Sequence, residues 1–203
     1  MTTFYFVRHG ETMVNRAQCF NGGGTNSTLT EAGQAAAKRL GSLLADQSFD
    51  ALLTSPLTRA VETMDAIVSQ TNQSQPAIMV VDDLKEMALG DWEGQPGASL
   101  TNHPQYENYF HHPELFDAKQ IHAESYQAVL ERGMLAIKTA QTAYPDGDVL
   151  VVAHGIILLF VINTLLGIPF EEIRSQKMVA NASLSVLKSN GTQFEKVVWN
   201  KTV

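Results

Sequence analysis

Residues 4–12 read Phe4-Tyr5-Phe6-Val7-Arg8-His9-Gly10-Glu11-Thr12, and this stretch decides the fold class. Its first four residues are a short apolar run, which is typical of a buried strand. A second apolar run, residues 149–153, also ends in a histidine and a glycine, His154 and Gly155. In an open α/β sheet, ligands bind beyond the carboxyl ends of the strands. The two His-Gly steps therefore predict one site at a single sheet edge.

Strands and helices alternate along the rest of the chain. Further strands are predicted over residues 51–54 and 78–81, and helices over 30–46, 57–69, 124–144 and 156–166. Near the end, Asn190-Gly191 separates two more strand-like runs and is a strong hairpin signal. We predict an α/β fold, a three-layer αβα sandwich with a mostly parallel sheet, helices on both faces and a C-terminal hairpin.

The apolar spacing also predicts which side of two helices is buried. For the helix 30–46, with Thr30 as its cap, the expected stripe is Ala35, Ala36, Leu40, Leu43 and Leu44. For the helix 124–144, the expected positions are Tyr126, Val129, Leu130, Gly133, Leu135 and Ile137.

A chain of 203 residues is long enough for one α/β domain with a substantial core and short for two. We therefore expect a single domain over residues 1–203. Residues 95–122 interrupt the alternation with prolines and aromatics, and we expect them to form an insertion or cap over the strand ends. Two uses stay open for four aromatic residues, lining a substrate mouth or packing the cap: Trp92, Tyr106, Tyr109 and Phe110.

The charge balance limits the possible partners. The chain has 14 Lys and Arg against 21 Asp and Glu, a formal charge of −7, and no dense basic run. Nucleic acid and anionic membranes are therefore not expected as partners, because both require an electropositive face. The longest apolar stretch, residues 156–166, is also well below the roughly 20 residues that cross a bilayer. The sequence leaves the oligomeric state open.

Cysteine usage and the start of the chain favour a cytoplasmic location. Cys19 is the only cysteine, so no intrachain disulfide can form. The first residues pass directly into a strand, without a basic stretch and an apolar core of the signal-peptide kind.

The residues around His9 have separable chemical uses. A neutral imidazole attacks phosphorus with one nitrogen when the other carries the proton and is tied to an acceptor. Arg8 supplies a planar fork of donors that matches phosphate oxygens. Taken alone, His9 and His154 would more often be strand-end histidines that are simply hydrogen-bonded.

A second motif, Ser55-Pro56-Leu57-Thr58-Arg59-Ala60-Val61-Glu62-Thr63, places Arg59 in the first turn of a helix that follows a strand. Its guanidinium can reach the same sheet edge, near a donor-rich helix start. With Arg-His-Gly near the start, Glu86 in midchain and His154-Gly155 late, the chain resembles the histidine phosphatase superfamily, the phosphoglycerate mutase-like proteins. The resemblance spans essentially the whole chain and implies the fold predicted above.

The resemblance implies a role for each matching residue. His9 corresponds to the phosphorylated nucleophile and Glu86 to the proton donor for the leaving alkoxide. The phosphate-binding group comprises Arg8, Asn15, Arg59, His154 and Gly155.

Two of these roles have rivals in the sequence. Asn15 could instead cap the turn that follows it. Asp91, Glu93 and Glu11 are other carboxylates that could supply the acid.

No cofactor and no metal are expected. Four histidines in or near the insertion, His103, His111, His112 and His122, have spacings that match no helical or finger-type metal site. The family requires no metal either.

Departures from the family concern the substrate. The mutases follow the late His-Gly with asparagine and carry basic residues in the midchain insertion, whereas here Ile156 follows Gly155 and Lys119 is the only basic residue between Lys85 and Arg132. This favours hydrolysis of a small phosphomonoester over phosphoglycerate mutation, because a buried unpaired carboxylate is costly. The unusual run Gly22-Gly23-Gly24 predicts a wider or more mobile mouth.

Three alternatives stay open: a cofactor-dependent phosphoglycerate mutase, a phosphoprotein phosphatase, and a noncatalytic phosphate-binding module. The last is disfavoured because a module that only binds phosphate needs no acid such as Glu86.

Overall fold

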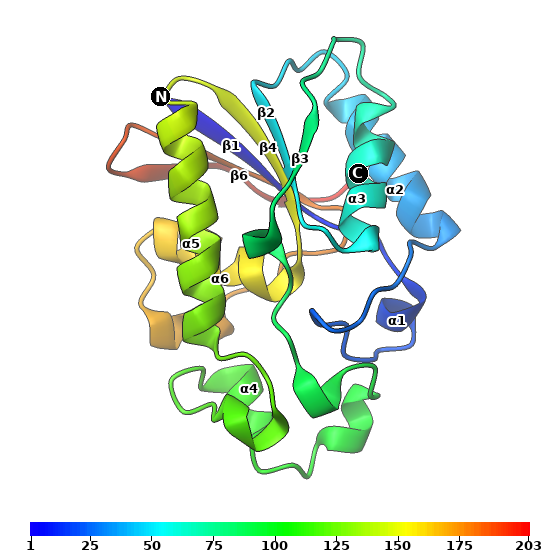
Figure 1. Cartoon of the computed structure of the whole chain (residues 1–203), viewed down its shortest axis with the longest axis vertical. Coiled ribbons are helices and arrows are strands. Elements are labelled where there is room, and N and C mark those ends of the chain that lie inside the picture. Colours follow the sequence, from blue (N-terminus) through cyan, green and yellow to red (C-terminus); the bar gives the residue numbers. More distant parts are fainter.

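One six-stranded sheet runs through the molecule, and the computed structural model describes all of residues 1–203 (Figure 1). The strands are β1 (Thr2–Arg8), β2 (Ala51–Thr54), β3 (Ile78–Val80), β4 (Asp148–Ala153), β5 (Leu184–Ser189) and β6 (Phe194–Lys201). Their order in the sheet is β3-β2-β4-β1-β5-β6. The pairs among β1 to β4 are parallel, and β5 and β6 add antiparallel pairs. The predicted mostly parallel sheet with a C-terminal hairpin is confirmed.

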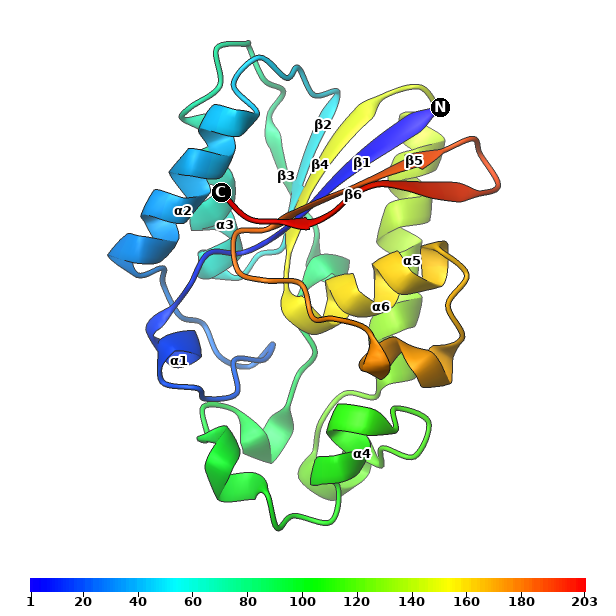
Figure 2. The ribbon, with the colours of Figure 1, turned by 180° about the vertical axis from the view of Figure 1, so that it is seen from behind.

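Helices cover both faces of this sheet. Figure 2 shows α2 (Glu31–Leu43) and α3 (Thr58–Val68) on one side, and α5 (Tyr126–Ala143) and α6 (Gly155–Leu165) on the other. Two further helices are short, α1 (Met13–Arg16) and α4 (Tyr106–His111). Five 3-10 turns complete the chain: Asp82–Leu84, Gly90–Trp92, Gly97–Leu100, Ala118–Ile121 and Phe170–Ser175. The predicted three-layer αβα sandwich is therefore confirmed.

The core has two layers, one on each face of the sheet, because successive side chains of a strand point to opposite faces. On β1, Phe4 and Phe6 belong to the larger apolar cluster, which α5 and α6 cover. Val7 belongs to the smaller cluster with Leu40 of α2 and Ile67 of α3. Burial on both faces explains why the central strands read as nearly continuous apolar runs.

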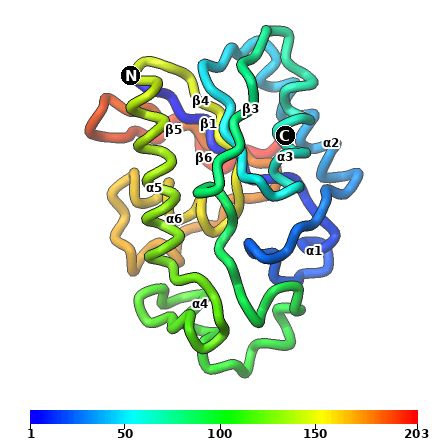
Figure 3. The backbone as a smooth tube through the Cα atoms, viewed as in Figure 1, coloured from blue at the N-terminus to red at the C-terminus, as the bar shows by residue number.

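The pairing register of β1 and β4 brings the two His-Gly steps together. β1 and β4 are parallel neighbours in which Arg8 lies opposite Ala153, and the N–H of His9 donates to the carbonyl of Ala153 at 3.0 Å. Residues 9 and 154 therefore leave the sheet side by side at its carboxyl edge. The segment 95–122, with α4, lies beyond that edge in Figure 3. Its description as an insertion or cap within one domain stays a prediction.

Two predicted helix faces are partly wrong. The cap of α2 is as expected, with Thr30 accepting from the N–H of Gly33 at 3.0 Å. Two residues of the predicted stripe are exposed, however: Ala35, and Leu43 at 45%. At Gly41, a Cβ atom would lie 2.6 Å from the carbonyl oxygen of Ile67. This close approach of α3 fixes the buried face at Gly41 and turns Leu43, two residues on, toward solvent.

In α5 as well, a glycine that lets a neighbouring helix approach closely fixes the buried face. Its Gly133 faces α6, where a Cβ atom would lie 2.6 Å from a side-chain carbon of Val161. Leu135 lies about 200° further round the helix at 100° per residue, and it is 59% exposed.

No helix in the structure has both the length and the apolar character that a membrane span requires.

Candidate active site

His9 is a buried imidazole with one nitrogen tied and one free. Its Nδ1 lies 2.7 Å from the carbonyl oxygen of Gly10, so Nδ1 carries the proton and donates. Nε2 has no hydrogen-bond partner in the protein. Burial, and then the charges of Arg8 and Arg59, hold the pKa of His9 well below its usual range. The ring is therefore neutral at physiological pH and keeps a lone pair on Nε2.

The glycine after this histidine allows close backbone packing. A Cβ atom at Gly10 would lie 2.7 Å from the carbonyl oxygen of Gly33 on α2. The N–H of Gly10 donates to Oγ1 of Thr63 at 2.9 Å, and Thr63 belongs to the same α3 motif as Arg59. Both contacts fix the turn that carries the imidazole.

His154 lies beside His9, with a ring-to-ring distance of 5.1 Å. Its Nδ1 accepts from Nε of Arg59 at 3.2 Å, and its Nε2 therefore donates to Oγ of Ser55 at 2.7 Å. Burial, followed by the charge of Arg59, keeps the pKa of His154 well below its usual range. Both of its nitrogens have protein partners, so direct contact with a phosphoryl group requires one of them to change partner.

Arg59 is completely buried and its guanidinium also contacts a loop. Nη1 donates to the carbonyl of Thr25 at 2.6 Å, and Nη2 donates to those of Asn21 and Gly22 at 3.2 and 3.0 Å. Burial lowers the pKa of Arg59 to about 10, which leaves it charged at neutral pH. The sequence prediction that Arg59 reaches the sheet edge is thus met in geometry, but most of its donors are already paired.

Arg8 presents one open edge to the site. Nη1 donates to the carbonyl of Val179 at 2.7 Å, while the buried Nε has no partner. The guanidinium lies against Gly155, where a Cβ atom would be 3.2 Å from Cζ of Arg8. Gly155 is the first residue of α6, and backbone N–H groups of a first turn lack helical acceptors. An anion there would find guanidinium and backbone donors together.

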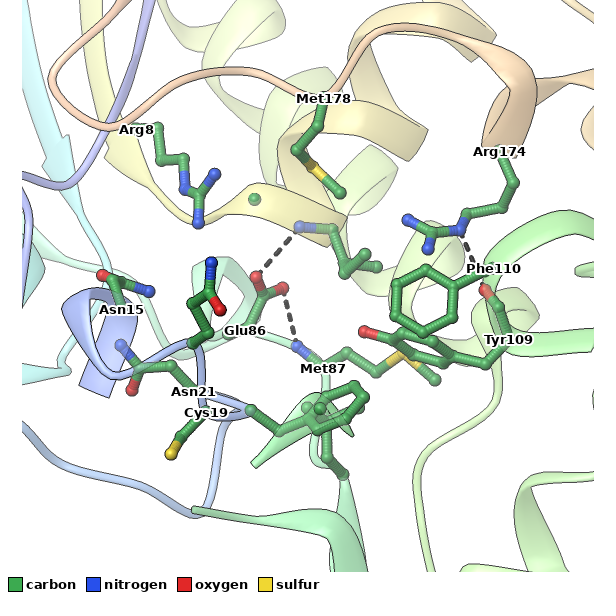
Figure 4. Close-up of a pocket in the computed structure, with 16 residues that line it drawn as sticks. Arg8, Asn15, Cys19, Asn21, Glu86, Met87, Tyr109, Phe110, Arg174 and Met178 are labelled. Atoms are coloured by element: carbon green, nitrogen blue, oxygen red, sulfur yellow. Dashed lines mark hydrogen bonds between the residues drawn. The ribbon is translucent and has the colours of Figure 1, made fainter. Parts of the chain in front are cut away.

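Asn15 takes part in the cap at the start of its own helix, α1, and not in a cap of the turn that follows it. Its Oδ1 accepts from the backbone N–H and the hydroxyl of Thr12 at 3.2 and 3.1 Å, within a capping box of α1. Its Nδ2 has no protein partner and points toward the pocket in Figure 4. The amide therefore caps with its oxygen and leaves its nitrogen as a donor.

The side chain of Glu86, from a different part of the chain, lies against the N-terminus of α6. Its carboxylate accepts from the backbone N–H groups of Met87 and Ile157 through Oε1, and from that of Ile156 through Oε2, all at 2.9 to 3.1 Å. Figure 4 draws the bond from Met87 to Glu86. A carboxylate is favourable at a helix N-terminus. Oε2 accepts only one of these bonds, so it has room for a proton on the pocket side.

The three rival carboxylates have other partners. Glu11 is paired with Arg16 at 2.6 Å, and Asp91 lies 2.9 Å from Nδ1 of the exposed His122. Glu93 binds the glycine loop, as described below. Among the four, Glu86 alone lines the pocket.

The glycine run, from which a wider or more mobile mouth was expected, is held by hydrogen bonds to Glu93 and Arg59. The carboxylate of Glu93 accepts from the N–H groups of Gly22 and Gly24 at 3.0 and 2.8 Å and from the hydroxyl of Thr25 at 2.6 Å. Arg59 holds carbonyl groups of the same loop. A Cβ atom at Gly22 or Gly23 would lie 2.5 Å from a neighbouring oxygen, so the loop packs where side chains do not fit.

A pocket of about 270 Å³ opens beside these residues. It is near the lower end of the range of small-molecule sites. Arg8, Asn15, Glu86 and Gly155 contribute to its wall. His9, Arg59 and His154 are buried and are not among the residues that line it.

The aromatic residues divide between the two predicted uses. Tyr109 and Phe110 line the pocket, whereas Trp92 is buried and packs against Tyr109 and His103. The segment 95–122 thus packs against Trp92 and supplies one wall of the site.

Sequence reasoning missed Arg174, which lines the pocket from the 3-10 turn Phe170–Ser175. The sequence analysis counted basic residues only over 85–132, so it did not include this cation. Ser55 and Thr63 lie inside the quoted α3 motif, so that motif could have indicated them.

Asn181 was missed as well. Its Nδ2 donates to the carbonyl of His9 at 3.0 Å across 172 positions of sequence. No local pattern signals such a contact.

The four other histidines do not gather. His111 lies near Glu107, His112 near Glu114 and His122 near Asp91, while His103 contacts Trp92.

Comparison with known proteins gives consistent matches. The model of the "Histidine phosphatase superfamily (branch 1)" matches residues 4–202. A Bacillus subtilis protein named "Uncharacterized phosphatase PhoE" is 32% identical, over 91% of this chain and 87% of the relative. The adenosylcobalamin/alpha-ribazole phosphatase of Escherichia coli is 30% identical, over 82% of this chain and 80% of the relative.

Solved structures agree with the fold. YhfR of Bacillus stearothermophilus superposes with a TM-score of 0.89 at 27% identity, over 98% of this chain and 97% of that structure. A structure titled as a putative alpha-ribazole-5'-P phosphatase from Escherichia coli gives a TM-score of 0.82 at 27% identity, over 98% and 96% of the two chains. The predicted phosphoglycerate mutase-like architecture is therefore confirmed.

Proposed function

Because the chain belongs to the histidine phosphatase superfamily, branch 1, we propose that it hydrolyses small phosphomonoesters through a phosphohistidine intermediate on His9. The phosphatase class itself follows from the family and from relatives that are named phosphatases. The observation that carries the mechanism is the free Nε2 of a neutral His9, whose Nδ1–H is held by the Gly10 carbonyl.

In the first step, Nε2 of His9 attacks phosphorus in line, and the bond from phosphorus to the leaving oxygen breaks. The open edge of Arg8, the N–H of Gly155 and Nδ2 of Asn15 bind the phosphoryl oxygens. Arg59 and His154 stabilise the charge that develops there. Glu86 gives its proton to the departing alkoxide.

In the second step, Glu86 as a carboxylate takes a proton from water, and the resulting hydroxide attacks phosphorus. The bond from nitrogen to phosphorus breaks, its electron pair returns to Nε2, and inorganic phosphate leaves. No metal ion takes part in either step.

The nucleophile is tested with p-nitrophenyl phosphate in the presence of a chelator. We expect turnover by the natural protein and a loss of about a thousandfold or more in His9→Ala. Acid-labile phosphate should be trapped on the natural protein and not on this variant. His122→Ala, at an exposed histidine, is the matched control. Full activity of His9→Ala would exclude His9 as the nucleophile.

The acid is tested by comparing leaving groups. An alkoxide needs the proton from Glu86 much more than p-nitrophenolate does, because the phenolate is the better leaving group. Glu86→Gln should therefore reduce the hydrolysis of alkyl phosphates by about tenfold more than that of p-nitrophenyl phosphate. Asp91→Asn is the control. Equal losses on both substrates would assign the proton to another group.

A pocket of about 270 Å³ suits a small metabolite better than a folded phosphoprotein. A panel of phosphorylated metabolites, read as released phosphate, tests this. The panel should include alpha-ribazole phosphate, since relatives carry that name. Release of phosphate from phosphoproteins and from none of the small metabolites would contradict the proposed class of small-molecule substrates.

A phosphoglycerate mutase is the second candidate, and Arg174 is the observation that favours it, because it gives the pocket a cation for a second anionic group. Priming by bisphosphoglycerate, with isomer transfer faster than phosphate release, would identify a mutase. Measurable turnover of either kind excludes a module that only binds phosphate.

A further inference from the structure

The pocket has a guanidinium at each of two separate places on its wall. Arg8 is the last residue of β1, and Arg174 comes from the turn Phe170–Ser175. Figure 4 shows them apart with Glu86 between them. Arg8 belongs to the proposed phosphoryl site. The mechanism proposed above does not use Arg174.

Arg174 is held in a fixed orientation. Its Nε donates to the carbonyl of Tyr109 at 2.9 Å (Figure 4). Its Cζ lies 5.0 Å from the ring centre of Tyr109 and 5.3 Å from that of Phe110, within the range of cation–π contacts. A guanidinium that is already ordered loses little entropy when it binds a ligand.

The terminal nitrogens of Arg174 have no hydrogen bond or ion pair within the protein. The side chain is half-buried and lines the pocket, so these donors face the space that a substrate would occupy. An Arg fork without a partner matches the geometry of a carboxylate or a phosphate.

The hydroxyl of Tyr109 is a second donor on this wall. It makes no hydrogen bond to the protein and points into the pocket in Figure 4. Burial raises the pKa of Tyr109 to about 12, against the opposite effect of Arg174, so the hydroxyl keeps its proton at physiological pH. The wall between the two guanidinium groups includes the apolar side chains of Met87, Ile156 and Met178.

We propose that Arg174 selects phosphomonoesters whose leaving group carries a second anion, a carboxylate or a phosphate, at the end of a short apolar spacer. This inference rests on the proposed phosphatase function and assigns Arg174 to specificity. Arg8 takes the transferred phosphoryl group, the apolar wall accommodates the spacer, and Arg174 with the Tyr109 hydroxyl binds the second anion.

The test uses two series of substrates and a neutral reference. ω-Carboxyalkyl phosphates and alkanediol bisphosphates of increasing chain length are compared with alkyl phosphates of the same length, and kcat/KM is measured for each. We expect one chain length at which the anionic substrate is preferred by about tenfold or more, the size of a charge-assisted hydrogen bond. The two anionic series distinguish a carboxylate from a phosphate.

Three variants assign the preference to Arg174. Arg174→Met should remove it, by about tenfold, while the alkyl phosphates change by less than about twofold. Arg174→Lys keeps the charge and should restore part of it. Arg39→Met, at an exposed arginine of α2, is the control and should leave the preference unchanged. A purely structural role for Arg174 would lower stability, measured in urea, and affect all substrates alike.

The outcomes separate the two proposals. If the natural protein hydrolyses no phosphomonoester, the proposed function fails and the role of Arg174 fails with it. If it hydrolyses anionic and alkyl substrates equally at every length, or if Arg174→Met slows both equally, only the assignment of Arg174 is overturned.

Discussion

Nε of Arg59 donates a hydrogen bond to Nδ1 of His154 over 3.2 Å, and this contact fixes the tautomer of the imidazole. An arginine can only donate, so Nδ1 must accept and the proton must lie on Nε2, which donates to Ser55. His154 is therefore a neutral imidazole with a hydrogen bond at each of its two nitrogens. This relationship has consequences for stability that can be measured.

Stability should fall as the pH falls through about 6.5. His9 and His154 have depressed pKa values in the folded protein, first because of burial. Below about pH 6.5 the unfolded chain binds protons at these two histidines and the folded chain does not. Each histidine can therefore lower the free energy of unfolding by up to about 1.4 kcal/mol per pH unit. The loss continues down to the folded-state pKa values.

Urea unfolding at several pH values between about 5 and 8 measures this effect. In His154→Gln the slope of stability with pH should become shallower, and in His111→Gln, at an exposed histidine, it should not change. A stability that is flat across this range would contradict the assignment of neutral histidines.

Ser55→Ala should destabilise the protein by about 1–3 kcal/mol, because it leaves the buried Nε2–H of His154 without an acceptor. The loss of this bond should also lower kcat, because the imidazole of His154 is then held only by Arg59. Urea denaturation and steady-state kinetics measure the two effects. Ser42→Ala, at an exposed hydroxyl on α2, is the control. An unchanged stability would mean that another group accepts this bond.

Glu93→Gln should loosen the loop from Asn21 to Thr25. The carboxylate accepts N–H groups of Gly22 and Gly24, and an amide presents a donor where an acceptor is needed. Faster hydrogen exchange at these two amides is expected, together with a stability loss of about 1–3 kcal/mol. Glu107→Gln, at an exposed glutamate of α4, is the control. Exchange at the natural rate would show that Arg59 alone holds the loop.

Two glycine substitutions should have different effects, one on stability and the other on catalysis. Gly10→Ala places a Cβ atom 2.7 Å from the backbone oxygen of Gly33, and neither backbone can move easily. It should destabilise the protein by about 1–3 kcal/mol, as overpacking does. Gly155→Ala meets the guanidinium of Arg8 at 3.2 Å, and a side chain can shift by a few tenths of an ångström.

Gly155→Ala should therefore keep the stability and lower kcat/KM for p-nitrophenyl phosphate by about tenfold or more, since small misplacements of binding groups are costly in catalysis. Urea denaturation and kinetics on both variants check the contrast. If Gly155→Ala were as active as the natural protein, Arg8 would not need its present position.

The sequence by itself determined the element types and most of their order. The apolar runs ending in His9 and His154 predicted two strands and one edge, because strand ends in a parallel sheet meet on the same side. Thr30 predicted its helix start, and Asn190-Gly191 predicted the hairpin between β5 and β6. These signals are local, since they depend on the conformation of neighbouring residues.

Only the tertiary structure decided which distant groups meet. The exposure of Leu43 and Leu135 follows from glycines that let helices approach closely, and helical spacing alone does not encode that choice. Arg174 reaches the pocket, and Asn181 reaches His9, through packing between segments far apart in the chain. The donors left free on Arg8 and the pairing of Arg59 with its loop are likewise properties of the packed chain. Local sequence fixes what a residue can do chemically, whereas packing fixes which partner it finds.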